Sequence, residues 1–452
     1  GSISGSFSPA NLPVGYSMSI VGNDLVVTKA PPVSLSTHFF RSITTGNWSA
    51  PATWESSPVS DFSSGVVSPA TLAPDDNANA ITIRNAHNVT INSAVTADQI
   101  VVATGGTLTQ SSTLSLANGA GDDLTVNGTW TWTFGALNGA GEAVISSSGS
   151  LNIVDGNERQ LAANLTNFGT MDWQDGPLRF PLVGTTITNN NLFTISGNNG
   201  SDQFNGSGHG ELINSITGTL TKTSAGATSF NHLSMANAGT LNINAGSITF
   251  INGTITNTSV INLTGSTLAV DPGVTFNWNG GSSLIGTGTL HFIHYSSWLV
   301  LNTDMVLPST VSMILASNVS GAGNLTCNGP LTLNSYYIEI NGPGTLAINE
   351  NSTWNGARVN RVTTLAAGKT LTMTTSTDKW LGANLTNNGI IDWQDGTIAF
   401  TAPGLTWTNT GTFMISGNNN TGGSGNCTIT NAGTISKTSG GATLWVNFNL
   451  TN

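Results

Sequence analysis

The sequence is poor in charge. Only 7% of its 452 residues are Asp, Glu, Lys or Arg, and 22 acidic residues outnumber 11 basic ones, giving a formal net charge of −11. A protein that holds a phosphate backbone needs basic side chains to neutralise it. The composition therefore argues against a nucleic-acid partner.

Long apolar runs are also absent. None approaches the roughly 18 residues of a membrane-spanning helix, so no membrane span is expected. Residues 1–7 lack the basic and apolar regions of a signal peptide, which indicates a mature chain or a fragment.

Cysteine is nearly absent. Cys327 and Cys427 are 100 residues apart, a separation of several repeats in this sequence. A disulfide needs Cα atoms within about 7 Å of each other. We therefore expect two free, buried thiols. Two such cysteines are compatible with either an oxidising or a reducing compartment.

Helix-forming patterns are missing as well, since Glu and Lys are scarce and no stretch keeps a 3.6-residue apolar period. What is present is 54 glycines, 38% hydrophobic residues and much Asn, Thr and Ser. That mixture is typical of many short strands joined by tight turns. It predicts an all-β protein.

A long segment occurs twice. Residues 161–199 align without a gap on residues 381–419, and 23 of the 39 positions are identical. A catalytic pocket normally occurs once in a domain, whereas a structural scaffold can be copied. Long repeats point first to a solenoid or an array.

A finer period runs inside the long one. Gly106, Gly128, Gly149 and Gly169 begin turn-and-strand patterns at steps of 22, 21 and 20 residues, and the same step recurs further along the chain. About 21 residues suffice for one coil of three short strands, which must stack on its neighbours to bury its apolar face. We predict a right-handed parallel β-helix with coils of about 20–22 residues.

Asparagine recurs at equivalent turns. Such residues tolerate left-handed backbone geometry, and stacked copies can bond to one another along the axis. N-glycan attachment at Asn-x-Ser/Thr is the alternative interpretation. The residues concerned are Asn167, Asn237, Asn257, Asn387, Asn409 and Asn431.

The sequence divides into three regions. Residues 1–40 resemble the end of a preceding module, residues 41–74 form a cap segment with Trp48 and Trp54, and residues 75–452 form the solenoid. The duplicated unit covers 161–228 and 381–443. Because the pattern is still running at residue 452, we expect the chain to join a neighbouring module or another copy of itself.

Several motifs carry a family resemblance: Gly46-Asn-Trp48 with Pro51-Ala-Thr-Trp54, Ile81-Thr-Ile83 with His87-Asn-Val-Thr-Ile91, Val95-Thr-Ala-Asp-Gln99, Gly105-Gly-Thr-Leu108 and Leu124-Thr-Val-Asn-Gly128. They resemble the large extracellular β-solenoid proteins of the Bacteroidota, multi-module surface adhesins and gliding-type cargo of the type IX secretion system. The resemblance implies stalks and fibres for surface contact and no catalytic residues. The family's C-terminal sorting domain is missing here.

Parallel β-helices also include polysaccharide hydrolases and lyases. Fragments of a polygalacturonase-like set occur at 121–123, 208–210 and 302–304, and in such an enzyme Asp122, His209 and Asp304 would carry the chemistry. Their order differs from that of such enzymes, which place acid and base on either side of the bond. No Arg-x-Lys follows, so we expect no enzyme.

Two pairs of carboxylates occur at equivalent places in the repeat: Asp172 with Asp175, and Asp392 with Asp395. Residues three apart on a strand face opposite sides, so the members of a pair would not converge. A turn with its tryptophan packed inward is the expected role, and calcium held by a carboxylate and loop carbonyls is the alternative. The structural residues of these turns are Trp173, Trp393, Asn167, Asn387, Gly169 and Gly389.

Most tryptophans are expected to stack in the core rather than on sugars; those in coil-like strands are Trp130, Trp132, Trp278, Trp354, Trp393 and Trp407. Both rings of the pair at 130 and 132 must lie on one face. His291 and His294 suggest a metal pair, but their spacing is that of a helix face in a segment that reads as strand.

These observations lead to one expectation and one alternative. The chain is expected to be a non-catalytic structural protein of a bacterial cell surface, located outside the cell, and to work as a stalk, an adhesin segment or a filament subunit. The alternative is a carbohydrate-binding or carbohydrate-active β-helix that contacts surface glycans. Exposed aromatics and carboxylates in a groove would favour the alternative.

Overall fold

The computed structural model describes all of the 452 residues except 1–11, 13–15, 23, 118–121, 199 and 202–209. It has 54% of its residues in strands and 1% in helix, and the fold is a parallel β-solenoid of about 16 turns. The prediction of an all-β parallel β-helix is confirmed. The chain divides into two compact units, residues 1–144 with 148–150, and residues 145–147 with 151–452.

The first unit starts with an antiparallel hairpin of β1 (Tyr16–Val21) and β2 (Asp24–Lys29), most of whose side chains are exposed. A cap of three strands follows. In it, β3 (Phe39–Ser42) pairs antiparallel with β5 (Trp54–Ser57) and parallel with β6 (Ala80–Ile83). β4 (Gly46–Asn47) pairs with β7 (Asn88–Ile91), and the short 3-10 helix at Pro51–Thr53 precedes β5. The cap thus supplies strand partners to the first coil.

The coils of this unit form three columns of parallel strands. The first column contains β6, β9 (Ile100–Val102) and β12 (Leu124–Val126), and the second contains β7, β10 (Thr107–Gln110) and β13 (Thr129–Trp132). The third contains β8 (Val95–Ala97), β11 (Leu114–Leu116) and β14 (Gly135–Gly139). β15 (Glu142–Ile145) and β16 (Ser150–Ile153) lie where the sequence passes from one unit to the other.

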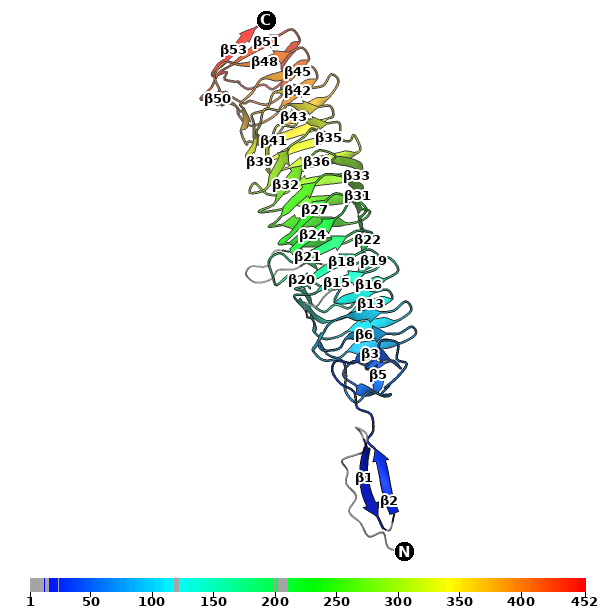
Figure 1. The fold of residues 1–452 in the computed structure, drawn as a ribbon. Helices are drawn as coiled ribbons and strands as arrows, with labels where there is room; N and C mark the ends of the chain where they lie inside the picture. Colours follow the sequence, from blue (N-terminus) through cyan, green and yellow to red (C-terminus); the bar gives the residue numbers. More distant parts are fainter. Residues whose placement is uncertain (1–11, 13–15, 23, 118–121, 199, 202–209) are drawn as a thin grey trace. The chain divides into compact units, whose positions relative to one another are not determined.

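The second unit continues the same design, and some of its strands are labelled in Figure 1. One column of parallel strand pairs runs from β18 to β50: β18 (Asn164–Asn167), β21 (Thr186–Asn189), β24 (Gly210–Asn214), β27 (Leu233–Asn237), β30 (Thr254–Asn257), β32 (Thr275–Trp278), β34 (Trp298–Leu301), β37 (Asn318–Ser320), β39 (Leu331–Ile340), β41 (Ser352–Val359), β44 (Lys379–Leu381), β47 (Ile398–Phe400) and β50 (Thr421–Gly423).

The remaining strands of this unit form the other two faces of the coils. One set comprises β19 (Thr170–Trp173), β22 (Leu192–Ile195), β25 (Thr219–Lys222), β28 (Thr240–Ile243), β35 (Met305–Leu307), β38 (Leu325–Cys327), β40 (Leu346–Ile348), β42 (Thr363–Leu365), β45 (Leu385–Asn387), β48 (Leu405–Asn409), β51 (Cys427–Asn431) and β53 (Phe448–Thr451). The other comprises β17 (Arg159–Leu161), β20 (Leu178–Arg179), β23 (Gly200–Ser201), β26 (Ala227–Asn231), β29 (Ser247–Ile251), β36 (Val311–Leu315), β43 (Thr370–Met373), β46 (Ile390–Trp393), β49 (Thr412–Ile415) and β52 (Thr434–Lys437). The long strands β31 (Val260–Val270) and β33 (Ser283–Phe292) run through a corner and contribute to both.

Strand alternation builds the core. In strand after strand, every second side chain points inward and is buried, as in β19, where Met171 and Trp173 are buried while the side chains between and before them are not. Each buried side chain stacks on its counterpart in the next coil, so apolar surface that one coil cannot cover alone is removed from water.

An unbroken column of core residues measures the coil. Strand pairing links Leu165 to Leu381 in ten steps through successive buried side chains. The 216 residues between the two leucines therefore give about 21.6 residues per coil. The expected coil length of about 20–22 residues is confirmed.

The two copies of the repeated segment lie on different faces. The residue at the end of the Leu165 column is Leu381, but the sequence alignment matches Leu381 with Leu161, which lies one strand before Leu165. A shift of 220 residues thus equals ten coils plus one strand. Both copies keep the same order of strands, but each strand of the second copy lies on the next face of the coil.

Domain boundaries read from the sequence differ from the compact units. The repeat pattern marks changes near residues 40 and 74, whereas the units divide near residue 150, inside a continuous series of coil-like patterns. No compositional change accompanies that division.

Candidate functional site

The duplicated turns hold the carboxylates that the sequence singled out. Asp172 points outward from β19, and its carboxylate accepts a hydrogen bond from the Ser196 hydroxyl at 2.7 Å. Asp175 lies in the following turn, where Oδ1 accepts the backbone N–H of Gly176 at 2.7 Å. The two carboxylates of the pair therefore serve separate local contacts.

The second copy repeats this arrangement. Asp392 accepts a hydrogen bond from Ser416, and Asp395 Oδ1 accepts the N–H of Gly396 at 2.7 Å. In the part of the chain that the structure describes, no three His, Cys, Asp or Glu side chains are grouped as metal ligands would be.

The tryptophans of these turns are core residues. Trp173 is 2% exposed and Trp393 is 0% exposed. Their indole N–H groups donate to the carbonyls of Gly176 at 2.8 Å and Gly396 at 2.7 Å. Each ring therefore closes its own turn from inside the coil.

Each turn also contains a buried cation that the sequence reading missed. Arg159 donates to the carbonyls of Asp155 and Asn157 at 2.5 Å each, and to that of Asp175 at 3.0 Å. Lys379 occupies the equivalent position and donates to four carbonyls, those of Thr374, Thr375, Thr377 and Asp395, at 2.5 to 2.9 Å. Both side chains are 0% exposed.

Burial lowers the pKa of both cations. The pKa of Lys379 falls to about 8 through desolvation, which Asp395 and Asp378 oppose. The pKa of Arg159 is also lowered by burial, against the charges of Asp155 and Asp175. Several carbonyl oxygens converge on one positive side chain in each turn. The side chain therefore occupies the place among oxygen ligands that a metal ion would take.

The expected asparagine ladders are present in both copies. In the first, side-chain amides connect Asn167, Asn189, Asn214, Asn237 and Asn257 at 2.7 to 2.8 Å. In the second, bonds of 2.7 Å connect Asn387, Asn409, Asn431 and Asn452.

The expectation of left-handed backbone geometry at these asparagines is wrong. Among the described residues with positive φ, none of the six predicted asparagines occurs. They lie at the ends of extended strands, where the amide turns inward and reaches the next coil. Asn167 Oδ1 also accepts the N–H of Gly169 at 3.1 Å, and Asn387 does the same for Gly389. The ladder therefore comes from strand register and not from left-handed turns.

Two carboxylates of the glycosidase-like fragments, Asp123 and Asp304, have local partners. Asp123 is 2% exposed and accepts the N–H of Glu142 at 2.8 Å. The pKa of Asp98 is raised, mainly by burial and in second place by the hydrogen bond between Asp98 and Asp123. Asp304 accepts two hydrogen bonds from Asn324, which lower its pKa. Asp122 is exposed, and His209 lies outside the described residues.

The histidine pair is also accounted for locally. Nδ1 of His294 accepts the backbone N–H of Ser296 at 3.1 Å, and its ring lies 4.2 Å from that of Tyr295. Burial lowers the pKa of His291, and the charge of Asp271 opposes this. The cysteines are free and buried as expected, and burial raises the pKa of each thiol to about 12.

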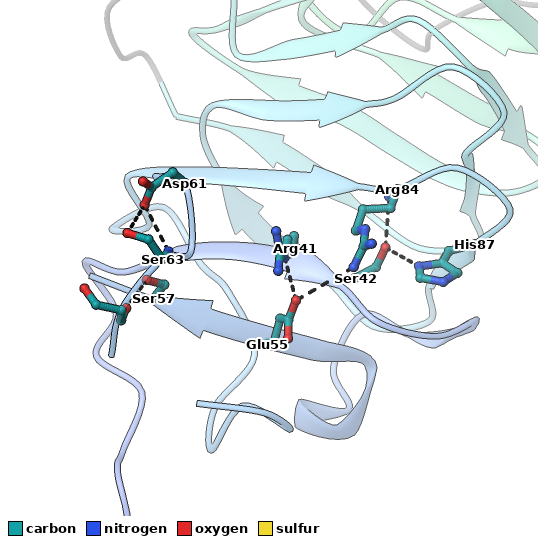
Figure 2. A network of polar contacts seen from close by, with 9 residues as sticks. Arg41, Ser42, Glu55, Ser57, Asp61, Ser63, Arg84 and His87 are labelled. Carbon is teal, nitrogen blue, oxygen red and sulfur yellow. Dashed lines mark hydrogen bonds and ion pairs between the residues drawn. The ribbon is translucent and has the colours of Figure 1, made fainter. Parts of the chain in front are cut away.

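A polar network joins the cap to the first coil (Figure 2). Glu55 is 8% exposed, and its Oε1 accepts the Arg41 Nε–H at 2.5 Å. The same oxygen lies 3.8 Å from a guanidinium nitrogen of Arg84, an ion-pair distance. Ser42 Oγ accepts the Arg84 backbone N–H at 2.9 Å and lies 2.8 Å from His87 Nδ1. These charges are used within the unit to hold β3 and β5 against the strands that follow.

One surface of the second unit gathers exposed aromatic side chains. Three of the chain's four tyrosines gather there, with exposed fractions of 51% for Tyr295, 46% for Tyr336 and 72% for Tyr337. Tyr337 lies 5.8 Å from Tyr295 and 5.3 Å from Tyr336 between ring centroids. Large aromatic groups are normally buried, so this cluster stands out from a chain whose predicted core tryptophans are all buried.

Tyr336 and Tyr337 border a hollow of about 190 Å³. It is lined by Tyr336, Tyr337, Ile338, Glu339, Arg358 and Trp380. We call these residues together with Tyr295 the tyrosine groove. Strand register places Glu339, Arg358 and Trp380 side by side on consecutive strands β39, β41 and β44. Their side chains therefore form one outward row across three coils.

The polar groups of the tyrosine groove are held in place. Arg358 donates to Glu339 Oε1 at 2.9 Å, and Asn341 donates to Oε2 at 2.7 Å. The Arg358 guanidinium also lies 5.5 Å from the centre of the Trp380 ring. Both ion-pair partners remain 41% exposed. Sequence alternation marks these residues as outward-facing, but it does not show that they meet.

No family model matches the chain, and no curated protein matches it. Within the described part of the chain, no helix is long and apolar enough to cross a membrane.

Proposed function

We propose that this chain is a non-catalytic structural protein, a β-solenoid segment of an extracellular stalk, adhesin or filament on a bacterial cell surface. The observation that carries the proposal is the filling of both duplicated turns by a protein cation, Arg159 in one and Lys379 in the other. The carboxylates of these turns accept local hydrogen bonds that close the coil.

The proposal is also supported by how the apolar core is built. Each coil stacks its inward residues on the next, and a scaffold of this kind can be lengthened by copying coils. The 220-residue duplication is what such lengthening leaves in a sequence. Duplication of a single catalytic pocket would have no comparable structural reason.

Electron microscopy of native material tests the structural role. Cells that produce the protein are labelled with an antibody against residues 151–452. We expect label on thin surface appendages or filaments, and loss of the appendages when the gene is deleted. Label confined to the cell interior, or unchanged appendages after deletion, would contradict the proposal.

The proposal includes contact of this chain with other modules or with further copies of itself, because coils are stabilised by the neighbours on which they stack. The mass of the native polypeptide under denaturing conditions distinguishes the two arrangements. A polypeptide much heavier than 46.4 kDa indicates covalent modules, and a band near 46.4 kDa from assembled material indicates stacked copies. A soluble monomer of 46.4 kDa from native material, with neither end associated, would contradict both.

The absence of catalysis is tested on polysaccharides. Purified chain is incubated with polygalacturonate and with neutral glycans, and released reducing ends are measured. We expect no turnover. Release that disappears in Asp122→Ala or His209→Ala would refute the non-catalytic proposal.

The alternative role of these carboxylates is calcium binding, at Asp172 and Asp175 or at Asp392 and Asp395. The melting temperature is measured with calcium and with a chelator. A rise with calcium that Asp395→Asn abolishes would support binding, and identical curves would refute it.

A further inference from the structure

We propose that the tyrosine groove binds an extended, uncharged saccharide chain built of pyranose units. The inference goes beyond the structural role, because a scaffold needs no exposed aromatic groove. It rests on three properties of the groove: exposed rings, fixed polar groups, and a row of side chains that crosses several coils.

The exposed rings supply stacking surface. Tyr337 is 72% exposed, and Tyr295 and Tyr336 are each about half exposed. Leaving such rings in water forgoes the free energy that their burial would contribute. The apolar C–H face of a pyranose ring fits flat against an aromatic side chain, so a bound sugar would cover them.

The polar groups supply hydrogen bonds to hydroxyls. Glu339 is anchored at both carboxylate oxygens by Arg358 and Asn341, yet the ion pair remains 41% exposed. Groups that are already oriented lose little conformational freedom on binding a ligand.

The row of outward residues indicates a chain rather than a single sugar. Trp298 pairs with Asn318, Glu339 with Arg358, and Arg358 with Trp380. The N–H of Glu339 donates to the Asn318 side chain, which connects the two segments of the row. Four strand steps of about 4.8 Å separate the two tryptophans, about 19 Å in all. A pyranose unit is about as long as one strand step, so successive sugars would meet successive coils.

The surroundings argue against other polymers. A peptide that adds as a strand needs an open sheet edge, but the strands β39, β41 and β44 are paired with one another and β44 continues to β47. The net charge of −11 opposes a nucleic acid or another polyanion. Because Arg358 and Glu339 are paired, the groove offers no unmatched charge, which fits an uncharged ligand.

Binding is tested by calorimetric titration of the full chain with hexasaccharides. The neutral probes are cello-, xylo-, manno-, chito- and maltohexaose, and hexagalacturonate is the acidic probe. We expect at least one neutral hexasaccharide to bind, and its affinity to fall at least tenfold in Tyr337→Ala and in Trp380→Ala. Tyr16→Ala changes the remaining tyrosine, which is 41% exposed in the β1–β2 hairpin, and should leave the affinity unchanged.

The variants are compared with the parent chain by circular dichroism and melting temperature, so that misfolding is separated from loss of binding. If Tyr337→Ala is destabilised, Glu339→Gln serves as the second variant, since it keeps the shape of the side chain and should weaken binding at least threefold. Failure of every neutral hexasaccharide to bind at millimolar concentration would overturn the proposal. So would tighter binding of hexagalacturonate, a preference for an unfolded peptide, or affinity unchanged in the groove variants.

Discussion

At the scale of single residues, the most informative feature is the buried cation of each duplicated turn. An isolated buried charge is costly, yet Arg159 and Lys379 are fully buried. They are tolerated because main-chain carbonyls of a tight turn need donors, and one cation supplies several at once. The chain uses Arg at one copy and Lys at the other, which indicates that donor number and charge matter more than shape.

Lys379 therefore separates loss of the donor from loss of volume. Lys379→Met keeps much of the side-chain length but leaves four carbonyls without their donor, and we expect a loss of about 3 kcal/mol in the stability of the surrounding coils. Lys379→Arg restores the residue of the other copy and should cost less than about 1 kcal/mol. Hydrogen exchange of residues 374–396 measures both. Equal exchange in the two variants would contradict this role.

Asp98 gives a pH-dependent prediction. Its pKa is raised in the folded protein by burial and by Asp123, so folding favours the protonated form. The stabilising contribution is therefore present below the unfolded pKa and lost as pH rises through the folded pKa.

Asp98→Asn mimics the protonated form and keeps the acceptor for the Gln99 N–H, which lies at 2.9 Å. We expect the variant to unfold at a higher temperature than the parent chain at pH 7. At pH 3 the two melting temperatures should be alike. A gain of equal size at both pH values would show that the carboxyl's ionisation is not the cause.

At the scale of elements, the asparagine ladders and the columns of core residues hold successive coils in register. In the first ladder, each amide from Asn167 to Asn237 donates to the next asparagine, so the ladder is a chain of buried groups. Such networks stabilise only when every member is satisfied. A single gap therefore leaves unpaired groups on both sides.

Asn214 is the middle member of the first ladder and is suited to test this. Asn214→Ala removes the acceptor of Asn189 and the donor to Asn237, and we expect a loss of about 2–3 kcal/mol. Asn244→Ala, at an exposed position, is the matched control and should change stability by less than about 0.5 kcal/mol. Urea unfolding followed by tryptophan fluorescence measures both. The ladder's role would be refuted if the two variants behaved alike.

At the scale of the molecule, neighbouring coils supply each other's core. A structure of this kind is a series of nearest-neighbour contacts, and its cooperativity does not extend over hundreds of residues. Stability therefore varies along the chain, and the two compact units provide one natural division.

Thermal unfolding should show this directly. We expect a scanning calorimeter to record more than one transition, with a van't Hoff enthalpy well below the calorimetric enthalpy for the whole chain. In the whole chain, Lys379→Met should remove one transition by destabilising residues 374–396. A separate protein of residues 151–452 without the substitution should retain that transition. A single two-state transition of the whole chain would contradict nearest-neighbour stabilisation.

The sequence by itself determined the fold class and the coil length. Strand alternation has a period of two residues and turns need glycine or short polar residues, and both signals are local, so they can be read without knowing any contact. It also determined which tryptophans are buried: Trp130, Trp132, Trp278, Trp354, Trp393 and Trp407 all lie in the core. The buried cations carried a signal as well, since Arg159 and Lys379 are in phase with the core leucines two residues later.

Only the tertiary structure decided which residues from different coils meet. Coil lengths vary by a few residues, and these differences add up along the chain. The 220-residue repeat consequently ends one face away from its first copy. For the same reason, no local pattern could place Tyr295 beside Tyr337, or Trp380 beside Arg358. Those contacts follow from the register of whole coils, which is fixed by the stacking of the buried core.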